Sequence, residues 1–166
     1  MTRPDFPGPK AVRELPLQLR MRVPPEWEDR NGHVNVQYYL RLYELGAWKI
    51  LEDGGFDEDW FSASGLSVFD LEHHLHFRAE LLVGDQVSCY HRVVARSAKR
   101  FHGVYLVVDD VQDVLAATVE YVAACIDMSS RRMTPWPAAM AAHMDRVIDG
   151  HNGLSWPVPL CGVLAP

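Results

Sequence analysis

Four strand-like runs follow one another in the middle of the chain, with only short turns between them. The runs cover residues 67–80, 86–96, 101–109 and 114–127. Glycine and polar residues fill the turns at residues 84–85, 97–100 and 110–113, as is usual where strands end. Turns this short favour antiparallel pairing, because a parallel pair needs a crossover of a dozen or more residues. The sequence therefore predicts an antiparallel sheet.

A helix is predicted ahead of this sheet, over residues 35–52. Apolar side chains recur there at spacings of three and four, which is the period of a helix with one buried face. These side chains are Val36, Tyr39, Leu40, Tyr43, Ala47, Ile50 and Leu51. Alternation over residues 17–23 predicts one further strand. One helix packed on an antiparallel sheet belongs to the α+β class.

The 166 residues divide into three segments, and one domain accounts for most of them. Prolines exclude regular structure from residues 1–16, which are expected to form an arm. Residues 17–137 form the domain, in which an aromatic loop at residues 54–65 is expected to be a lid or an interface. Residues 138–166 carry a short helix closed by Gly150 and an apolar tail, which is expected to dock on the domain or on a second subunit.

The composition indicates a soluble, folded protein and argues against several kinds of partner. A net charge of −6 disfavours nucleic acid, because phosphate-backbone binding needs many cations on one face. No run of residues approaches the roughly 20 apolar residues of a membrane span, and the start of the sequence lacks the apolar run of a signal peptide. We therefore expect a cytoplasmic protein with no membrane partner. The three cysteines have no paired-ligand spacing and are expected to be reduced.

Residues 28–39, EDRNGHVNVQYY, stand at the start of the predicted helix and allow two interpretations. Asp29 or Asn31 could cap the helix, with Gly32 in a tight turn. The same residues could form a catalytic site, because free N–H groups and the positive end of the helix dipole stabilise an oxyanion. A carboxylate beside them could then attack a carbonyl carbon or direct water at it. The spacing alone leaves both interpretations open.

This segment resembles the motif D-x-x-G-H-V-N-x-x-x-Y, followed by E, of the hotdog-fold acyl-CoA thioesterases of the 4-hydroxybenzoyl-CoA thioesterase type. The matching residues are Asp29, Gly32, His33, Val34, Asn35, Tyr39 and Glu44. The resemblance extends over roughly residues 17–135 and implies a hotdog fold, in which an antiparallel sheet wraps one long central helix. It also implies hydrolysis of an acyl-CoA to the free acid and CoA, by a homodimer or a dimer of dimers with active sites between subunits.

By this resemblance, Asp29 is the catalytic carboxylate, acting as a nucleophile or as a general base on water. The backbone N–H of Val36 or of Asn35 would polarise the thioester carbonyl, and the Asn35 side chain would hold the water or order the turn. His33 is a further catalytic candidate, and its alternative role is that of a helix-start histidine bonded to the backbone. Glu44, on the flank of the apolar face, is either a second catalytic carboxylate or a structural hydrogen-bonding group at a dimer interface.

Three short patterns resemble a narrower subgroup, the betainyl-CoA thioesterases that accompany bacterial carnitine breakdown. They are E-x-H at Glu72 and His74, K-R-x-H at Lys99, Arg100 and His102, and A-T-x-E at Ala117, Thr118 and Glu120. The residues that the two resemblances assign to substrate binding are Gly32, Tyr39, Glu72, His74, Lys99 and Arg100. The two basic residues suit the phosphates of CoA, and ordinary surface charge is their alternative explanation.

The subgroup also implies a small, polar acyl group that carries a quaternary ammonium. Aromatic faces bind such a cation at roughly 0.5–2 kcal/mol each. The rings available for it are Trp27, Tyr38, Trp48, Trp60 and Phe61. Glu120 lies in an apolar strand and needs a partner, for which His102 and Lys99 are the candidates.

Residues 71–80, LEHHLHFRAE, allow a competing interpretation as a metal site. Alternation puts Glu72, His74 and His76 on one face of a strand, and these groups suit zinc or non-haem iron. The spacing from His74 to Glu80 imitates part of the first cupin motif, but the second histidine box is missing from the sequence. We therefore expect no metal and no redox cofactor, with CoA present only as part of the substrate.

The main alternative function is a non-catalytic acyl-CoA binding module on the same fold. Asp29 argues against it, because the carboxylate, the glycine turn and Asn35 are all in register with the catalytic motif. A dehydratase or hydratase on this fold would carry a histidine-centred helix motif, which residues 35–52 lack.

Overall fold

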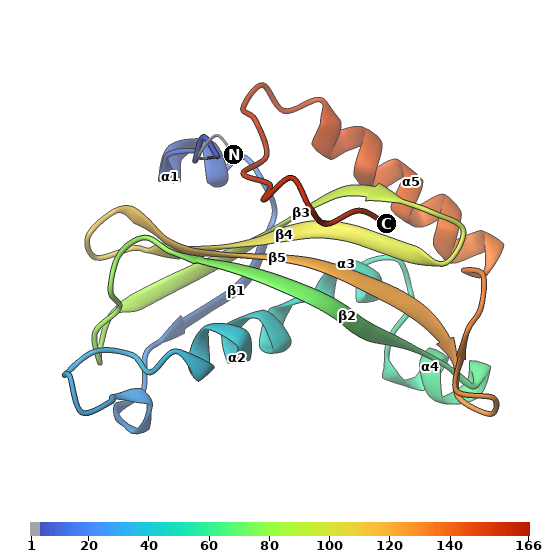
Figure 1. The fold of residues 1–166 in the computed structure, drawn as a ribbon, viewed down its shortest axis with the longest axis horizontal. Helices are drawn as coiled ribbons and strands as arrows, with labels where there is room; N and C mark the ends of the chain where they lie inside the picture. The colour runs from blue at the N-terminus through green and yellow to red at the C-terminus, as the bar shows by residue number, and fades with distance from the viewer. Residues whose placement is uncertain (1–3) are drawn as a thin grey trace.

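The computed structural model describes residues 4–166 and shows a curled antiparallel sheet with a helix in its hollow (Figure 1). The strands are β1 (Leu17–Arg22), β2 (Leu66–Phe77), β3 (Gln86–Arg96), β4 (Arg100–Asp109), β5 (Val114–Asp127) and β6 (Arg132–Met133). Their order across the sheet is β1-β3-β4-β5-β2, with β6 paired to β5. Neighbouring strands are antiparallel, so the predicted sheet and the α+β class are confirmed.

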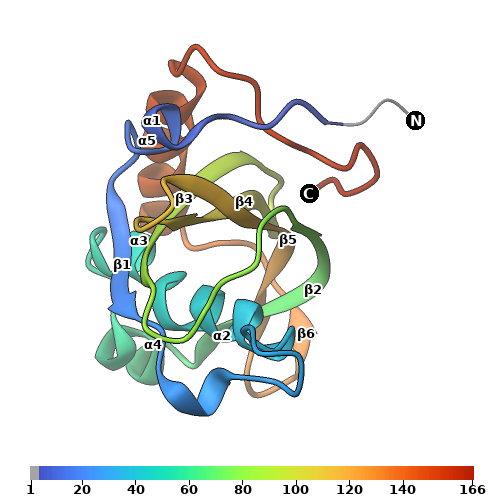
Figure 2. The same cartoon turned by 90° about the vertical axis from the view of Figure 1, so that its left-hand side faces the viewer.

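The helix in the hollow is shorter than predicted, because the single helix expected over residues 35–52 is divided in two. α2 (Gln37–Gly46) lies inside the curl of the sheet, and α3 (Lys49–Glu52) continues it after a turn at Ala47 and Trp48 (Figure 2). Ile50 and Leu51 of α3 are buried in an apolar cluster shared with α5 (Ala138–Asn152). Burial of these two side chains offsets the interruption of the helix.

Only part of the predicted apolar face of α2 enters the core. Tyr39, Leu42 and Tyr43 are buried against the sheet. Val36 and Leu40, which the spacing assigned to the buried face, are 60% and 37% exposed. The exposed side of α2 therefore remains available to line a cavity or to meet a partner.

β2 forms one edge of the sheet, and within residues 4–166 it pairs with β5 alone. A β-bulge between Asp70 and Glu72 shifts the pairing register by one residue. Because of this bulge, Asp70 and His73 both face α2, whereas strict alternation would place them on opposite faces. Phe69 and Leu71 are 40% and 43% exposed, which is unusual for large apolar side chains on a sheet edge.

The two ends of the chain form a second core on the outer face of the sheet, away from α2. The predicted arm is not free of regular structure, since α1 (Pro9–Val12) is a short helix that begins at a proline. Val12 and Trp156 are buried there with Val104 of β4. Docking of the C-terminal tail on the domain is thus confirmed. Residues 1–3 of the predicted arm lie outside the described residues.

The aromatic loop predicted at residues 54–65 contains α4 (Glu58–Ser64). The Asp57 carboxylate caps this helix by accepting a hydrogen bond of 2.9 Å from the Trp60 N–H. Phe56 and Phe61 are buried in the same cluster as α5, so these rings belong to the core rather than to an exposed lid. α5 itself runs on to Asn152, past the Gly150 that was expected to close it.

Candidate active site

The turn before α2 holds Asp29 in a fixed conformation. The Asp29 N–H donates to the His33 carbonyl at 2.9 Å, and the Gly32 N–H donates to the Asp29 carbonyl at 3.1 Å. Gly32 has a φ of +83°, a conformation that favours glycine, which accounts for its place in the motif. The Asp29 carboxylate accepts from the backbone N–H of Asn31 at 2.7 Å and from its side-chain amide at 3.3 Å.

These hydrogen bonds keep Asp29 ionised. The bond from the Asn31 N–H is the main cause, and it lowers the pKa of Asp29 below its ordinary value of 3.8. His33 lies close, with Nδ1 at 3.6 Å from Asp29 Oδ2 and 3.2 Å from the Val34 carbonyl oxygen. With its proton on Nδ1, the ring donates to that carbonyl, which is the structural role considered for His33 as an alternative to catalysis.

The start of α2 offers one unoccupied backbone donor. The Asn35 N–H donates to the Trp27 carbonyl at 2.8 Å, and the Asn35 side-chain oxygen accepts from the Gln37 N–H at 3.2 Å. The Val36 N–H has no acceptor within the part of the chain that the structure describes. Of the two donors considered for the thioester carbonyl, Val36 is therefore the one left available, at the positive end of the helix dipole.

A cavity of about 490 Å³, here named the helix-start cavity, brings most of the predicted catalytic group together. Its lining includes Asp29, His33, Asn35, Val36 and Tyr39. The other wall comes from the end of β2, with Phe77 edge-on to the Tyr39 ring at 5.0 Å between centroids. A carboxylate and a backbone donor on one cavity wall are the groups that acyl transfer requires.

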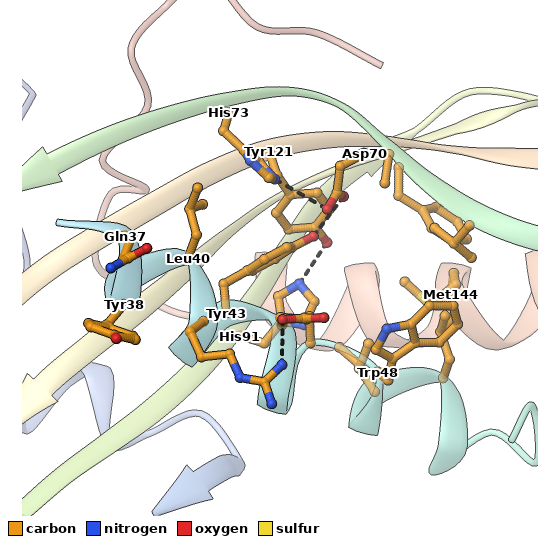
Figure 3. Close-up of a pocket in the computed structure, with 18 of the residues that line it drawn as sticks. Gln37, Tyr38, Leu40, Tyr43, Trp48, Asp70, His73, His91, Tyr121 and Met144 are labelled. Carbon is orange, nitrogen blue, oxygen red and sulfur yellow. Dashed lines mark hydrogen bonds and ion pairs between the residues drawn. The ribbon is translucent and has the colours of Figure 1, made fainter. Parts of the chain in front are cut away.

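A second cavity of about 590 Å³, here named the helix–sheet cavity, lies between α2, α3 and the strands β2 and β5 (Figure 3). Tyr43 donates a hydrogen bond of 2.8 Å to Asp70, whose other carboxylate oxygen is 3.3 Å from His73 Nε2. His91 Nε2 lies 2.6 Å from the Tyr121 hydroxyl. The sequence analysis did not select any of these five residues for the site.

Glu44 lines the helix–sheet cavity, away from the other predicted catalytic residues. It forms an ion pair of 2.6 Å with Arg41 one turn earlier on α2, and its side chain is 65% exposed. The rings proposed to bind a cationic acyl group fall into two sets. Trp27, Tyr38 and Trp48 line this cavity, whereas Trp60 and Phe61 pack in the cluster around α4 and α5.

The remaining predicted substrate-binding residues lie outside the lining of either cavity, among the residues described. Glu72 and His74 point away from α2, on the outer face, where His74 is the register partner of Glu120. Lys99 lies at the turn between β3 and β4 and donates to the Met133 carbonyl at 3.2 Å. Arg100 begins β4 at the same turn.

Glu120 is almost fully buried on the outer face and has two partners. It accepts from His102 Nε2 at 2.8 Å and from the Cys161 N–H at 2.7 Å. The expectation of a partner is confirmed for His102, and Lys99 is not that partner. The second bond ties the C-terminal tail to the sheet.

Among residues 4–166, no group of three or more His, Cys, Asp or Glu side chains is arranged to hold a metal ion. In the same part of the chain, none of the helices is long and apolar enough to cross a bilayer.

Comparison with known proteins identifies the class. Residues 23–144 match the family described as the thioesterase-like superfamily, and the chain belongs to this family. Its fold is the hotdog fold, and it is a thioester hydrolase. The resemblance found in the sequence is thereby confirmed.

Four curated relatives carry betainyl-CoA thioesterase in their names. The Pseudomonas aeruginosa betainyl-CoA thioesterase is 28% identical over 137 residues, which is 82% of this chain and 85% of that protein. The Ruegeria pomeroyi L-carnitine dehydrogenase/betainyl-CoA thioesterase is 27% identical over 157 residues, which is 90% of this chain but only 32% of that protein.

Solved structures show the same architecture at low sequence identity. A Staphylococcus aureus protein solved in complex with CoA has a TM-score of 0.80 and 20% identity, covering 92% of this chain and 96% of that one. A 1,4-dihydroxy-2-naphthoyl-CoA thioesterase from Synechocystis has a TM-score of 0.67 and 18% identity, with coverage of 84% and 97%.

Proposed function

We propose that this protein hydrolyses the thioester of a small, polar acyl-CoA, with betainyl-CoA as the leading candidate, and that Asp29 is the catalytic carboxylate. The observation that carries the proposal is that the Asp29 carboxylate and the unoccupied Val36 N–H line one cavity. The names of the relatives support the choice of acyl group.

The reaction uses both groups at the carbonyl of the thioester. The Val36 N–H, at the positive end of α2, binds the thioester carbonyl oxygen and stabilises the negative charge that develops on it. Asp29 either attacks the carbonyl carbon directly or removes a proton from an attacking water. In both routes the C–S bond breaks, CoA leaves as the thiol, and one water is consumed to give the free acid.

Asn35 and Tyr39 position these groups. The Asn35 side chain holds the first turn of α2 through the Gln37 N–H, which keeps the Val36 donor directed into the cavity. Tyr39 and Phe77 form an apolar wall of the cavity beside the carbonyl. Glu44 and the outer-face residues Glu72 and His74 remain candidates for contacts made elsewhere on the substrate.

We further propose that the active protein is a homodimer, or a dimer of dimers, joined along β2. The free edge of β2 and the exposed side chains of Phe69 and Leu71 support a second copy as the partner. A two-fold axis through the middle of β2 pairs the strand antiparallel with its copy. The end of β2 at Phe77, beside Asp29, then lies next to the beginning of the strand in the other copy.

The test of catalysis is thiol release from a panel of betainyl-, acetyl-, medium-chain and hydroxybenzoyl-CoA. We expect Asp29→Asn to lower kcat by roughly 10²- to 10⁴-fold, because the amide can neither attack nor accept a proton. Asp53→Asn removes an equal charge from an exposed ion pair with Lys49 and should leave kcat unchanged. If no ester is hydrolysed by the wild type, or if Asp29→Asn keeps full activity, the proposal is wrong and a binding module takes its place.

The test of assembly is the molar mass in solution, measured by light scattering. Leu71→Lys should convert the protein to a monomer and abolish activity with it, because it places a charge on the proposed interface. Val111→Lys is the matched control, since Val111 is 65% exposed in the turn between β4 and β5 and should leave the mass unchanged. A wild-type monomer with full activity would contradict this proposal.

A further inference from the structure

The helix–sheet cavity has the chemistry of a receptor for a cation. Its walls present six aromatic rings together with the carboxylate of Asp70. The rings are Trp27, Tyr38, Tyr43, Trp48, Phe101 and Tyr121. Ring faces attract a cation through their quadrupole, and a carboxylate attracts it through its charge.

The charges on the cavity walls do not cancel. Arg41 and Glu44 neutralise each other at 2.6 Å on α2. Asp70 has no Arg or Lys within ion-pair distance among the described residues, and its contacts are the Tyr43 hydroxyl and His73, which is charged only when protonated. His91, at the wall beside Tyr121, is kept neutral by burial, which lowers its pKa to about 3. With His73 neutral, a net negative charge therefore stays with Asp70.

The conformation of Asp70 is fixed by the fold. The bulge after Asp70 turns its side chain toward α2, and the Tyr43 hydroxyl holds one carboxylate oxygen at 2.8 Å. The side chain is 36% exposed, so part of the carboxylate remains accessible from the cavity. Holding the group in place before the ligand arrives reduces the cost of binding.

We propose that the helix–sheet cavity receives the acyl group of the substrate, and that Asp70, oriented by Tyr43, selects acyl groups that carry a positive charge. The inference rests on the proposed thioesterase function and on the dimer. Pairing of β2 across a two-fold axis brings the Asp29 site at the Phe77 end of one strand beside the first half of the other strand, which carries Asp70 and borders the cavity. The carbonyl then lies on one subunit while its substituent enters the cavity of the second.

The decisive comparison uses two thioesters of the same shape. Betainyl-CoA and 3,3-dimethylbutanoyl-CoA differ only in a quaternary nitrogen in place of a quaternary carbon, so their kcat/KM ratio measures the selection for charge. We expect the wild type to prefer betainyl-CoA by tenfold or more, and Asp70→Asn to lose about tenfold of that preference while its rate on the neutral ester changes little. A tenfold change corresponds to about 1.4 kcal/mol.

Two further variants refine the assignment. Tyr43→Phe keeps the carboxylate and removes the hydrogen bond that orients it, so it should lose a smaller part of the preference. Asp53→Asn, an exposed change of equal charge outside the cavity, should keep the whole preference. Equal rates of wild type on the two esters, or an equal loss on both in Asp70→Asn, would overturn the role of Asp70.

Subunit mixing tests the position of the cavity relative to Asp29. If Asp29 of one copy works with Asp70 of the other, then exchange between Asp29→Asn and Asp70→Asn proteins creates one intact site in each mixed dimer. Random exchange makes half of the dimers mixed, so betainyl-CoA activity should recover to about a quarter of the wild-type value. Activity no higher than the mean of the two separate variants would place both residues in the same subunit's site.

Binding separates a failure of this inference from a failure of the proposed function. Asp29→Asn protein is titrated with each of the two thioesters, and tryptophan fluorescence reports binding, since Trp27 and Trp48 line the cavity. Preference for the charged ester without turnover by the wild type would keep the cation receptor and remove the thioesterase proposal. Turnover by the wild type without a preference for the charged ester would keep the thioesterase proposal and remove the cation receptor.

Discussion

His91 and Tyr121 are hydrogen-bonded inside the helix–sheet cavity, with 2.6 Å between His91 Nε2 and the tyrosine hydroxyl, and both side chains are buried. Burial lowers the pKa of His91 to about 3, and it also lowers the pKa of His151, which lies near it. These two histidines therefore stay neutral in the folded protein at pH values at which they become protonated in the unfolded chain, which begins near pH 6.5.

The stability of the protein should depend on pH because the pKa values of these histidines differ between the folded and unfolded states. The free energy of unfolding should be highest above pH 6.5. Between pH 6.5 and 5 it should fall by up to roughly 1.4 kcal/mol per pH unit on account of His91, with a further decrease from His151. Urea denaturation across this range measures the slope. His91→Gln should make this slope shallower, and an unchanged slope in that variant would show that His91 is not responsible.

Glu120 should stabilise the fold through its two hydrogen bonds. Burial alone would raise its pKa, but the bonds from His102 and the Cys161 N–H outweigh burial and leave the pKa below its ordinary value of 4.5. Glu120→Gln should lower the free energy of unfolding by about 1.5–3 kcal/mol, the contribution of a hydrogen bond to a charged group. Since the pKa is lowered, this contribution is complete above pH 4.5 and is lost as the pH falls further.

Limited proteolysis provides an independent measurement of the same bond. Loss of the bond to Cys161 should make the C-terminal tail easier to cleave in Glu120→Gln than in the wild type. Glu58→Gln, in the exposed first turn of α4, should be cleaved like the wild type. Equal cleavage of all three proteins would indicate that Glu120 does not hold the tail.

Two helical glycines should respond in opposite directions to the same substitution. A methyl group at Gly46 of α2 would collide with the Tyr105 hydroxyl and lie 3.1 Å from Leu19 Cβ, so Gly46→Ala should destabilise the protein by about 1–3 kcal/mol. Gly150 of α5 has open space around it, and Gly150→Ala should stabilise by about 0.5–1 kcal/mol through helix propensity. Thermal denaturation of both variants measures this, and stabilisation by Gly46→Ala would contradict the close contact of α2 with the sheet.

The pH dependence of the rate should reflect the lowered pKa of Asp29. The carboxylate has to be ionised in either catalytic route, and the Asn31 N–H keeps it so below pH 3.8. We therefore expect kcat/KM to remain level, as far as Asp29 is concerned, from pH 8 down to the limit of folded protein. A decrease of kcat/KM toward acid pH that disappears in His33→Gln would instead assign an essential role to His33.

The strands and the helix-start motif could be predicted from the sequence because both depend on local pattern. Alternation fixes which side chains of β5 share a face of the sheet, although both of its faces are buried, and Gly32 with Asp29 defines a turn over a few residues. The donor at the start of α2 could not be chosen in this way. The Asn35 N–H is occupied by the Trp27 carbonyl, which is eight residues earlier and reaches it only because the chain folds back at the turn.

The helix–sheet cavity escaped prediction for a related reason. Tyr43 could be assigned to a buried helix face, but its hydrogen bond to Asp70 joins elements 27 residues apart. Asp70 and His73 have opposite parity in the strand, so alternation separates them. Only the bulge places them together, and neither glycine nor proline in the strand marks its position.

The bulge changes which residues of β2 face α2. Before it, even-numbered residues such as Val68 and Asp70 face α2, and after it the odd-numbered His73 and Leu75 do so. Deletion of Leu71 would restore regular alternation, so that every second residue along the whole strand would face α2. When related sequences are aligned, a one-residue gap placed at Leu71 therefore decides which residue of each relative is compared with Asp70. The acyl group expected for that relative depends on this choice.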